Sequence, residues 1–220
     1  MERRITLTED GSHTLYLPGM DEHYHSTHGA IQESTHVFIN TGLKPINKTQ
    51  LTIFEVGFGT GLNAWLTLKA CKQLNKTVNY FTIEKYPLNQ NEYRILNYGK
   101  LNEEDDFHTF LSLHKCDWGK ISQITTAFNL YKFKADIKTF EFDNLPDFNL
   151  VYFDAFAPNK QEDVWSFEIF KKLYEQCAVN GVLVTYCAKG AVRRTLQEVG
   201  FKVERLPGPP GKREMLRAIK

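Results

Sequence analysis

Short apolar runs recur along the chain from about residue 50 and alternate with segments of helical periodicity. Four of the runs are rich in β-branched and aromatic residues and end at polar or turn residues, which is typical of buried strands. These runs cover residues 51–56, 78–83, 148–153 and 182–187. Between them, Leu62, Trp65, Leu66 and Leu74 fit one helical stripe, and Val164, Phe167, Phe170 and Leu173 fit another. The order strand, helix, strand predicts right-handed crossovers and a mostly parallel sheet.

Three further strands are expected. One covers residues 129–133, where apolar and polar positions alternate imperfectly. Two more cover residues 201–206 and 214–219 and are joined by the Pro/Gly-rich loop 207–211. A loop this short cannot make a crossover, so this final pair should be antiparallel. The interpretation is one α/β domain over residues 1–220, Rossmann-like, with a core over 51–220.

Residues 1–50 lie outside the repeating pattern and resemble an added cap. We expect a hairpin over residues 5–17 and a helix over 26–40.

A glycine-rich turn, Glu55-x-Gly57-x-Gly59-x-Gly61, stands where the first strand of the core ends and a helix begins. Glycines let the backbone turn sharply and approach a ligand without side-chain obstruction. The dinucleotide fingerprint G-x-G-x-x-G would place its third glycine where Leu62 stands. The spacing therefore favours a cofactor without a pyrophosphate.

Two acids follow the next strands. Glu84 ends the second strand, where a carboxylate can accept hydrogen bonds from ribose hydroxyls. Asp136 follows the strand at 129–133 and could receive a purine amino group, or equally cap a helix over residues 137–140. A glycine turn with acids at successive strand ends is more specific than any one of these features, and it predicts an adenosine-containing cofactor.

Asp154 ends the strand at 148–153 and opens the sequence Asp-Ala-Phe-Ala-Pro. In methyl transfer from a sulfonium to an alkyl amine, a carboxylate there could orient the amine and help remove its proton. Phe156 would form an apolar wall, and Pro158 would stiffen the loop. The competing interpretation is an aspartate that only caps the following turn.

Composition narrows the class of protein further. With 42% hydrophobic and 24% charged residues the chain is an ordinary globular protein, and its net charge of +1 does not by itself indicate a nucleic-acid partner. The stretch 189–220 is basic and 103–106 is acidic, and both could be solvated faces. No apolar run is long enough to span a membrane and the start lacks the apolar core of a secretory signal, so a cytoplasmic protein is expected.

The cysteines and histidines give no sign of metal chemistry. Cys71, Cys116, Cys177 and Cys187 have no zinc-site spacing and fit reduced thiols. Three histidines, at 23, 25 and 28, could in principle bind zinc. Because their spacing places no i, i+4 pair at His23 and His25 and no general base accompanies them, no metal site is predicted.

Six segments together resemble one family, the methyltransferase half of the bifunctional tRNA wobble-uridine enzyme MnmC and its stand-alone form MnmD. They are residues 24–43, 54–63 (FEVGFGTGLN), 81–88 (FTIEKYPL), 154–165 (DAFAPNKQEDVW), 188–201 and 211–216 (GKREML). The resemblance implies a class I fold dependent on S-adenosylmethionine and methylation of 5-aminomethyl-(2-thio)uridine at the tRNA wobble position. The loop after Pro158 departs from the family pattern, and the sequence shows no flavin-dependent oxidoreductase half.

The same resemblance implies a role for each site residue. The cofactor would be held by Glu55, Gly57, Phe58, Gly59, Thr60, Gly61, Asn63, Glu84, Lys85, Asp136 and Asp154, with Asp154 also catalytic. The tRNA would contact Phe156, Pro158, Lys160, Arg193, Arg194, Lys212 and Arg213. Two alternatives stay open: a methyl- or aminopropyltransferase acting on a small amine, and a cofactor- or RNA-binding module without catalysis.

Overall fold

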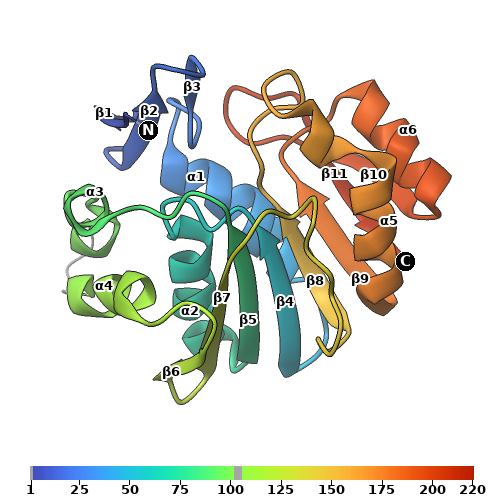
Figure 1. Cartoon of the computed structure of the whole chain (residues 1–220), viewed down its shortest axis with the longest axis horizontal. Helices are drawn as coiled ribbons and strands as arrows, with labels where there is room; N and C mark the ends of the chain where they lie inside the picture. The colour runs from blue at the N-terminus through green and yellow to red at the C-terminus, as the bar shows by residue number, and fades with distance from the viewer. Residues whose placement is uncertain (1, 102–105) are drawn as a thin grey trace.

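A twisted sheet of eight strands forms the centre of the molecule (Figure 1). The structure is a computed structural model that describes residues 2–101 and 106–220, so residues 103–105 of the acidic run lie outside the described residues. The strands lie in the order β10-β11-β9-β8-β4-β5-β7-β6. Their bounds are β4 Gln50–Val56, β5 Thr77–Glu84, β6 Ile121–Thr125, β7 Phe128–Lys134, β8 Phe148–Phe153, β9 Cys177–Thr185, β10 Lys202–Pro207 and β11 Glu214–Ile219.

The pairing agrees with the predicted mostly parallel sheet. β4 pairs in parallel with both β5 and β8, β5 with β7, and β8 with β9. The final pair is antiparallel, as the short loop requires, since β11 runs against both β9 and β10. β6 adds a second antiparallel edge beside β7.

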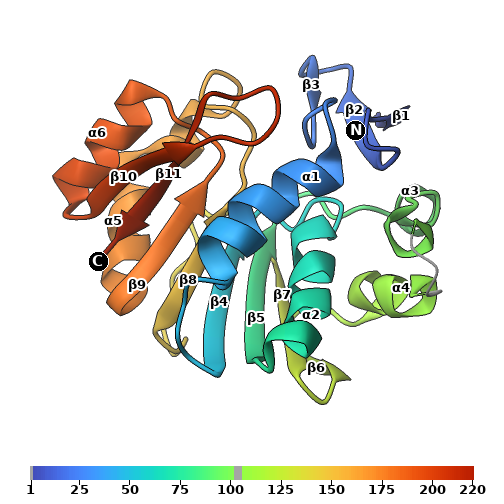
Figure 2. The same ribbon diagram turned by 180° about the vertical axis from the view of Figure 1, so that it is seen from behind.

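Helices cover both faces of the sheet (Figures 1 and 2). On one face lie α1 Ala30–Ser34, its continuation as a π-helix over Thr35–Leu43, and α2 Leu62–Leu74, with α4 Phe107–Lys115 beside α2. On the other lie α5 Phe167–Gln176 and α6 Gly190–Val199. The remaining helical segments are α3 Gln90–Arg94 and two 3-10 turns, Tyr98–Lys100 and Glu162–Trp165.

Each face of the sheet has its own core, because successive side chains of a strand point to opposite faces. On β4, Ile53 packs into the cluster under α2 and the π-helix, whereas Phe54 packs into the cluster under α5 and α6. Both side chains are fully buried. Burial on two faces explains why these strands appear in the sequence as continuous apolar runs.

The predicted cap is a small sheet followed by a helix. Its strands are β1 Arg4–Leu7, β2 His13–Leu17 and β3 Glu22–His23, paired antiparallel in the order β1-β2-β3. The helix begins at Ala30, later than the expected residue 26, and extends to Leu43. Within it Gly42 permits close packing on the sheet, because a Cβ there would lie 3.1 Å from Val184.

Several elements differ from the sequence-based expectation. β9 begins at Cys177, directly after α5, and ends at Thr185. The stripe from Val164 to Leu173 is not one helix, because Ser166 is extended and caps α5. β6, α4 and α6 were not predicted.

Within the described ranges, no helix is both long and apolar enough to cross a membrane. The four cysteines are free thiols, and three of them are buried.

Candidate active site

A cavity of about 430 Å³ opens at the carboxyl ends of the central parallel strands. Its walls come from the cap, from the loops after β4, β5, β7 and β8, and from the loop between β10 and β11. The lining residues are Met20, Glu22, His23, Tyr24, His25, Ser26, Thr27, Glu33, Val56, Gly57, Phe58, Gly59, Thr60, Leu62, Asn63, Ile83, Glu84, Lys85, Tyr86, Ala135, Asp136, Ile137, Asp154, Ala155, Phe156, Ala157, Gln161, Val164, Tyr186 and Lys212. The cavity therefore lies where ligands bind in open α/β sheets.

The glycine turn forms the floor of this cavity. Gly57, Gly59 and Gly61 have φ of 93°, 49° and 74°, a backbone region that residues other than glycine rarely adopt. At Gly57 there is also no room for a side chain, because a Cβ would lie 2.7 Å from the backbone oxygen of Asp154. The turn thus brings bare backbone to the cavity between β4 and β8, while Gly61 starts α2 behind it.

The acid at the end of β5 is held beside the turn. One oxygen of Glu84 accepts the Gly59 N–H at 3.0 Å, and the other accepts the Tyr86 N–H at 2.7 Å. Each carboxylate oxygen has a second lone pair, so both can still accept hydrogen bonds from a ligand hydroxyl.

Asp136 lines the cavity and also caps a turn. Its carboxylate pairs with Lys85 at 2.9 Å and accepts the Lys138 N–H at 3.0 Å. Burial acts to raise the pKa of Asp136, but these hydrogen bonds outweigh it and hold that pKa below its usual value. Residues 137–139 form a turn and not a helix. The alternative that Asp136 caps a helix over 137–140 is therefore wrong about the helix, although Asp136 does cap this turn.

Asp154 stands at the tip of β8 and is oriented by α2. Asn63 donates a hydrogen bond from Nδ2 to Oδ2 of Asp154 at 2.7 Å. Burial raises the pKa of Asp154 to about 7, although the Asn63 hydrogen bond acts in the opposite direction. A carboxylate with such a pKa is a better base than an exposed one and still ionises near neutral pH.

Glu55 does not line the cavity, contrary to the prediction of a cofactor contact. Its side chain is fully buried and accepts a hydrogen bond from Thr82 at 2.8 Å. Its Oε1 has no hydrogen-bond partner among the described residues. Burial, reinforced by the charge of Asp154, raises the pKa of Glu55 to about 8. Glu55 therefore lies beneath the glycine turn as a neutral group at pH 7.

Aromatic side chains lie beside the glycine turn at the cavity. The rings of Tyr24 and Phe156 meet edge to face, with 5.0 Å between centroids. Trp165 donates from Nε1 to the Phe156 backbone oxygen at 2.7 Å, and Tyr186 donates to that of Ala155 at 2.9 Å. Only Phe156 of these was predicted as a site residue. The others carry no signal in the periodicity, and Tyr24 and Trp165 stand in the sequence analysis only within matching segments.

The five basic residues expected at phosphates do not form one group. Lys212 lines the cavity, where it makes an ion pair with Glu33 and lies 4.0 Å from the ring centroid of Tyr186. Lys160 donates to the Met20 backbone oxygen at 2.7 Å, which ties the loop after β8 to the cap. Arg193, Arg194 and Arg213 lie outside the cavity lining, as does Pro158.

The three neighbouring histidines point to different partners. His25 shares a 2.7 Å hydrogen bond with Thr60, and burial lowers the pKa of His25 to about 4, so it is neutral. His28 contacts Glu9, and His23 packs on Tyr16. Over the ranges 2–101 and 106–220, no group of three or more His, Cys, Asp or Glu side chains could hold a metal ion.

The doubly wound sheet with a glycine turn and acids at its strand tips is the architecture of a nucleoside-cofactor enzyme. A family model described as S-adenosyl-L-methionine-dependent methyltransferase matches residues 106–220. The chain belongs to this family, and its cofactor is S-adenosylmethionine.

Two curated relatives and one crystal structure are similar to the chain over most of its length. The chain is 31% identical over 235 residues to the tRNA 5-methylaminomethyl-2-thiouridine biosynthesis bifunctional protein MnmC of Burkholderia thailandensis, covering 96% of this chain and 34% of the relative. The MnmC of Cupriavidus necator is 31% identical over 216 residues, covering 91% and 32%. The chain thus spans about a third of the length of these curated relatives. A crystal structure of MNMC2 from Aquifex aeolicus matches with a TM-score of 0.81 and 27% identity, over 99% of this chain and 70% of that one.

Proposed function

We propose that this enzyme transfers the methyl group of S-adenosylmethionine to the exocyclic amine of 5-aminomethyl-(2-thio)uridine at the tRNA wobble position. The product would be the 5-methylaminomethyl nucleoside. The observation that carries the proposal is the position of Asp154, a partly exposed carboxylate with a raised pKa that lines the cavity together with the glycine turn and the rings of Tyr24 and Phe156. The biosynthetic product in the names of the MnmC relatives supports the choice of acceptor.

The cofactor would lie along the glycine turn. Backbone from Gly57 to Asn63 would hold its methionine part, Glu84 its ribose, and Asp136 with Lys85 its adenine end. The residues fit such a group, because the turn excludes side chains at Gly57 and the Glu84 oxygens keep free lone pairs. When bound, the cofactor supplies an electrophilic methyl group.

Asp154 would prepare the acceptor. An alkyl amine is mostly protonated at pH 7 and has no lone pair for attack until it loses a proton. The Asp154 carboxylate, fixed by Asn63, would hold the ammonium group in line with the methyl and take that proton directly or through water. The Lys212–Glu33 ion pair near it carries no net charge, so it leaves the attraction of Asp154 for a cation in place.

The flat base would rest against the Tyr24 and Phe156 rings, since aromatic side chains are common platforms for unstacked RNA bases. Phosphate contacts would fall to Arg193, Arg194 and Arg213, because Lys160 and Lys212 have partners inside the protein.

The purified protein tests this directly. It should transfer label from methyl-labelled cofactor to tRNA isolated from a strain that lacks this gene, and nucleoside mass spectrometry should detect 5-methylaminomethyluridine derivatives. Label that enters a small amine such as a polyamine, and leaves tRNA unlabelled, would refute the tRNA assignment.

Asp154→Asn should lose activity and keep the cofactor. We expect kcat to fall by about 10²- to 10⁴-fold, the usual contribution of a general base, with little change in calorimetric affinity for S-adenosylhomocysteine. In the unaltered protein kcat/KM should fall below pH 7 as Asp154 takes up a proton, and the variant should lack this limb. Asp117→Asn, at an exposed acid paired with Lys120, is the matched control. Turnover that survives in Asp154→Asn would end the proposed role.

A further inference from the structure

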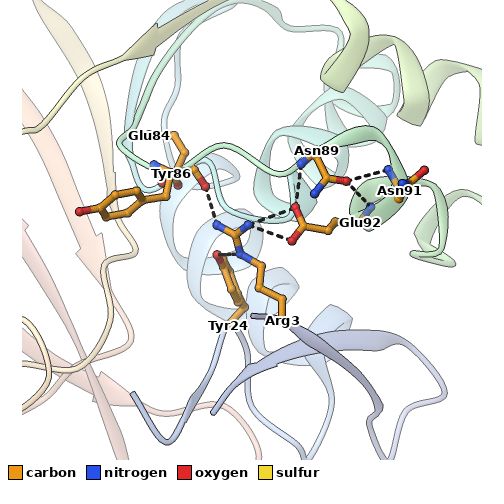
Figure 3. Close-up of polar contacts among 7 residues, drawn as sticks. All are labelled: Arg3, Tyr24, Glu84, Tyr86, Asn89, Asn91 and Glu92. Carbon is orange, nitrogen blue, oxygen red and sulfur yellow. Dashed lines mark hydrogen bonds and ion pairs between the residues drawn. The ribbon is translucent and has the colours of Figure 1, made fainter. Parts of the chain in front are cut away.

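A buried arginine close to the amino terminus joins three segments around the cavity. The side chain of Arg3 is only 6% exposed, whereas that of its neighbour Arg4 is 64% exposed. Figure 3 shows the Arg3 guanidinium between the cap and the loop that follows β5. Burying a charged guanidinium costs desolvation free energy, so a buried arginine is uncommon unless its N–H donors all have partners.

The guanidinium uses all three of its nitrogens (Figure 3). Nε donates to the Tyr24 hydroxyl at 3.0 Å, and Nη2 donates to the Tyr86 backbone oxygen at 2.7 Å. Nη1 contacts both carboxylate oxygens of Glu92 at 3.0 and 3.1 Å. Glu92 is itself fixed, because it forms a capping box with Asn89 at the start of α3. The charge of Arg3 is thus balanced by a carboxylate that has its own anchor.

One partner of Arg3 reaches the aromatic side of the cavity. The Tyr24 ring packs on Gly59, where an added Cβ would lie 3.1 Å from Cδ1, and meets Phe156 edge to face. Burial raises the pKa of Tyr24 to about 12, so its hydroxyl is neutral at working pH and accepts from Arg3 as a phenol. The hydrogen bond from Arg3 to the Tyr24 hydroxyl therefore holds the tyrosine ring at the end farthest from its backbone.

The other partners reach the cofactor side. Tyr86, whose carbonyl accepts from Arg3, donates its own N–H to Glu84. Glu84 in turn accepts the Gly59 N–H, and Gly59 is the residue against which Tyr24 packs. Arg3, Tyr86, Glu84, Gly59 and Tyr24 therefore close a ring of contacts around one edge of the cavity.

We propose that Arg3 is a positioning residue that sets the spacing between the Tyr24 side of the cavity, where the acceptor base rests, and the Glu84 loop, where the cofactor ribose is held. The proposal rests on the proposed function, since it takes the aromatic wall as the acceptor side. Arg3 does not line the cavity, and it would act through the Tyr24 hydroxyl and the Tyr86 carbonyl.

Arg3→Met keeps the apolar stem and removes the three contacts. We expect kcat/KM for tRNA to fall about tenfold, as for the loss of one charge-assisted hydrogen bond, mainly through a higher KM. Affinity for S-adenosylhomocysteine, which needs no acceptor, should weaken several-fold in calorimetry. Arg4→Met, which removes an exposed cation paired with the nearby Glu2, should leave both quantities within twofold.

A double-mutant cycle tests the route of action. Tyr24→Phe keeps the ring and the Arg3–Glu92 pair, so it also serves if Arg3→Met does not fold. If Arg3 acts through the hydroxyl, the two changes together should cost clearly less than the product of their separate effects. Independent effects, or wild-type kinetics in Arg3→Met, would overturn the inference. An unaltered protein that fails to methylate tRNA would instead refute the proposed function, and the calorimetric effect of Arg3→Met would still be readable.

Discussion

Glu55 is a buried carboxyl group whose proton links stability to pH. Its pKa lies near 8 in the folded chain and near the ordinary value of 4.5 when the chain unfolds. Between these values the folded protein keeps a proton that the unfolded chain releases, so rising pH favours unfolding. The charge of Asp154 adds to this effect.

Glu55→Gln should therefore stabilise the protein at alkaline pH. The amide keeps the acceptor for Thr82 and removes the cost of burying a charge. We expect the melting temperature at pH 8 to rise by at least about 2 °C, which corresponds to roughly 1 kcal/mol for a chain of this size. The gain should shrink as the pH approaches 4.5, and Glu198→Gln, on the exposed face of α6, should show no such pH dependence. A variant that is less stable at pH 8 would mean that Glu55 is ionised in the folded state.

Some residues of the site can be placed from the sequence, and others cannot. Asp154, Glu84 and Asp136 can be placed, because polar residues at the ends of parallel strands all face one crevice. Glu33 and Lys212 cannot be paired from the sequence, since their contact joins positions far apart in the chain. The sequence assigns Lys212 to phosphates because charge along a chain does not reveal which cations the fold encloses.

Among the elements, the turn from β4 to α2 is tightly restricted by sterics. Gly57→Ala would combine a positive φ with a Cβ 2.7 Å from the backbone oxygen of Asp154. The clash should displace the tip of β8, so we expect loss of measurable cofactor binding in calorimetry together with lower stability.

Gly119→Ala separates the effect of the positive φ from the effect of the steric clash. Gly119 has a φ of 76°, and the described residues place nothing within 4 Å of a Cβ there. It should lose only about 1 kcal/mol for the backbone conformation and keep full cofactor affinity. Equal losses in the two variants would show that the approach of Asp154 is not what requires a glycine at 57.

Elements buried on two faces are recovered closely from the sequence, whereas marginal ones are not. β8 and β11 have the expected bounds, and α2 contains the predicted stripe of Leu62, Trp65, Leu66 and Leu74, because these apolar patterns are dense. β6 is a short edge strand with little burial, and its pattern gives no strong signal. The imperfect alternation in β7 has a specific cause, since the buried Lys132 donates to the Leu113 and His114 carbonyls at the end of α4.

At the scale of the whole molecule, the cavity collects residues from almost the full length of the chain, from Met20 in the cap to Lys212 in the last loop. A ligand seated there contacts only the folded arrangement, so it should stabilise the protein by mass action. At a hundredfold excess of S-adenosylhomocysteine over its dissociation constant the gain is about 2.7 kcal/mol, or roughly 5–11 °C in melting temperature. Differential scanning fluorimetry would measure this shift. Adenosine triphosphate at equal excess should give none, and a comparable shift would contradict the cofactor assignment.

The carboxyl terminus lies at the opposite end of the sheet from the cavity. β11 runs against β9, so the chain leaves the sheet beside Asn180 and Gly181, where Lys220 completes the last backbone hydrogen bonds (Figure 1). A polypeptide joined after Lys220 would therefore emerge on the side of the sheet away from the cavity and would leave the cavity mouth uncovered.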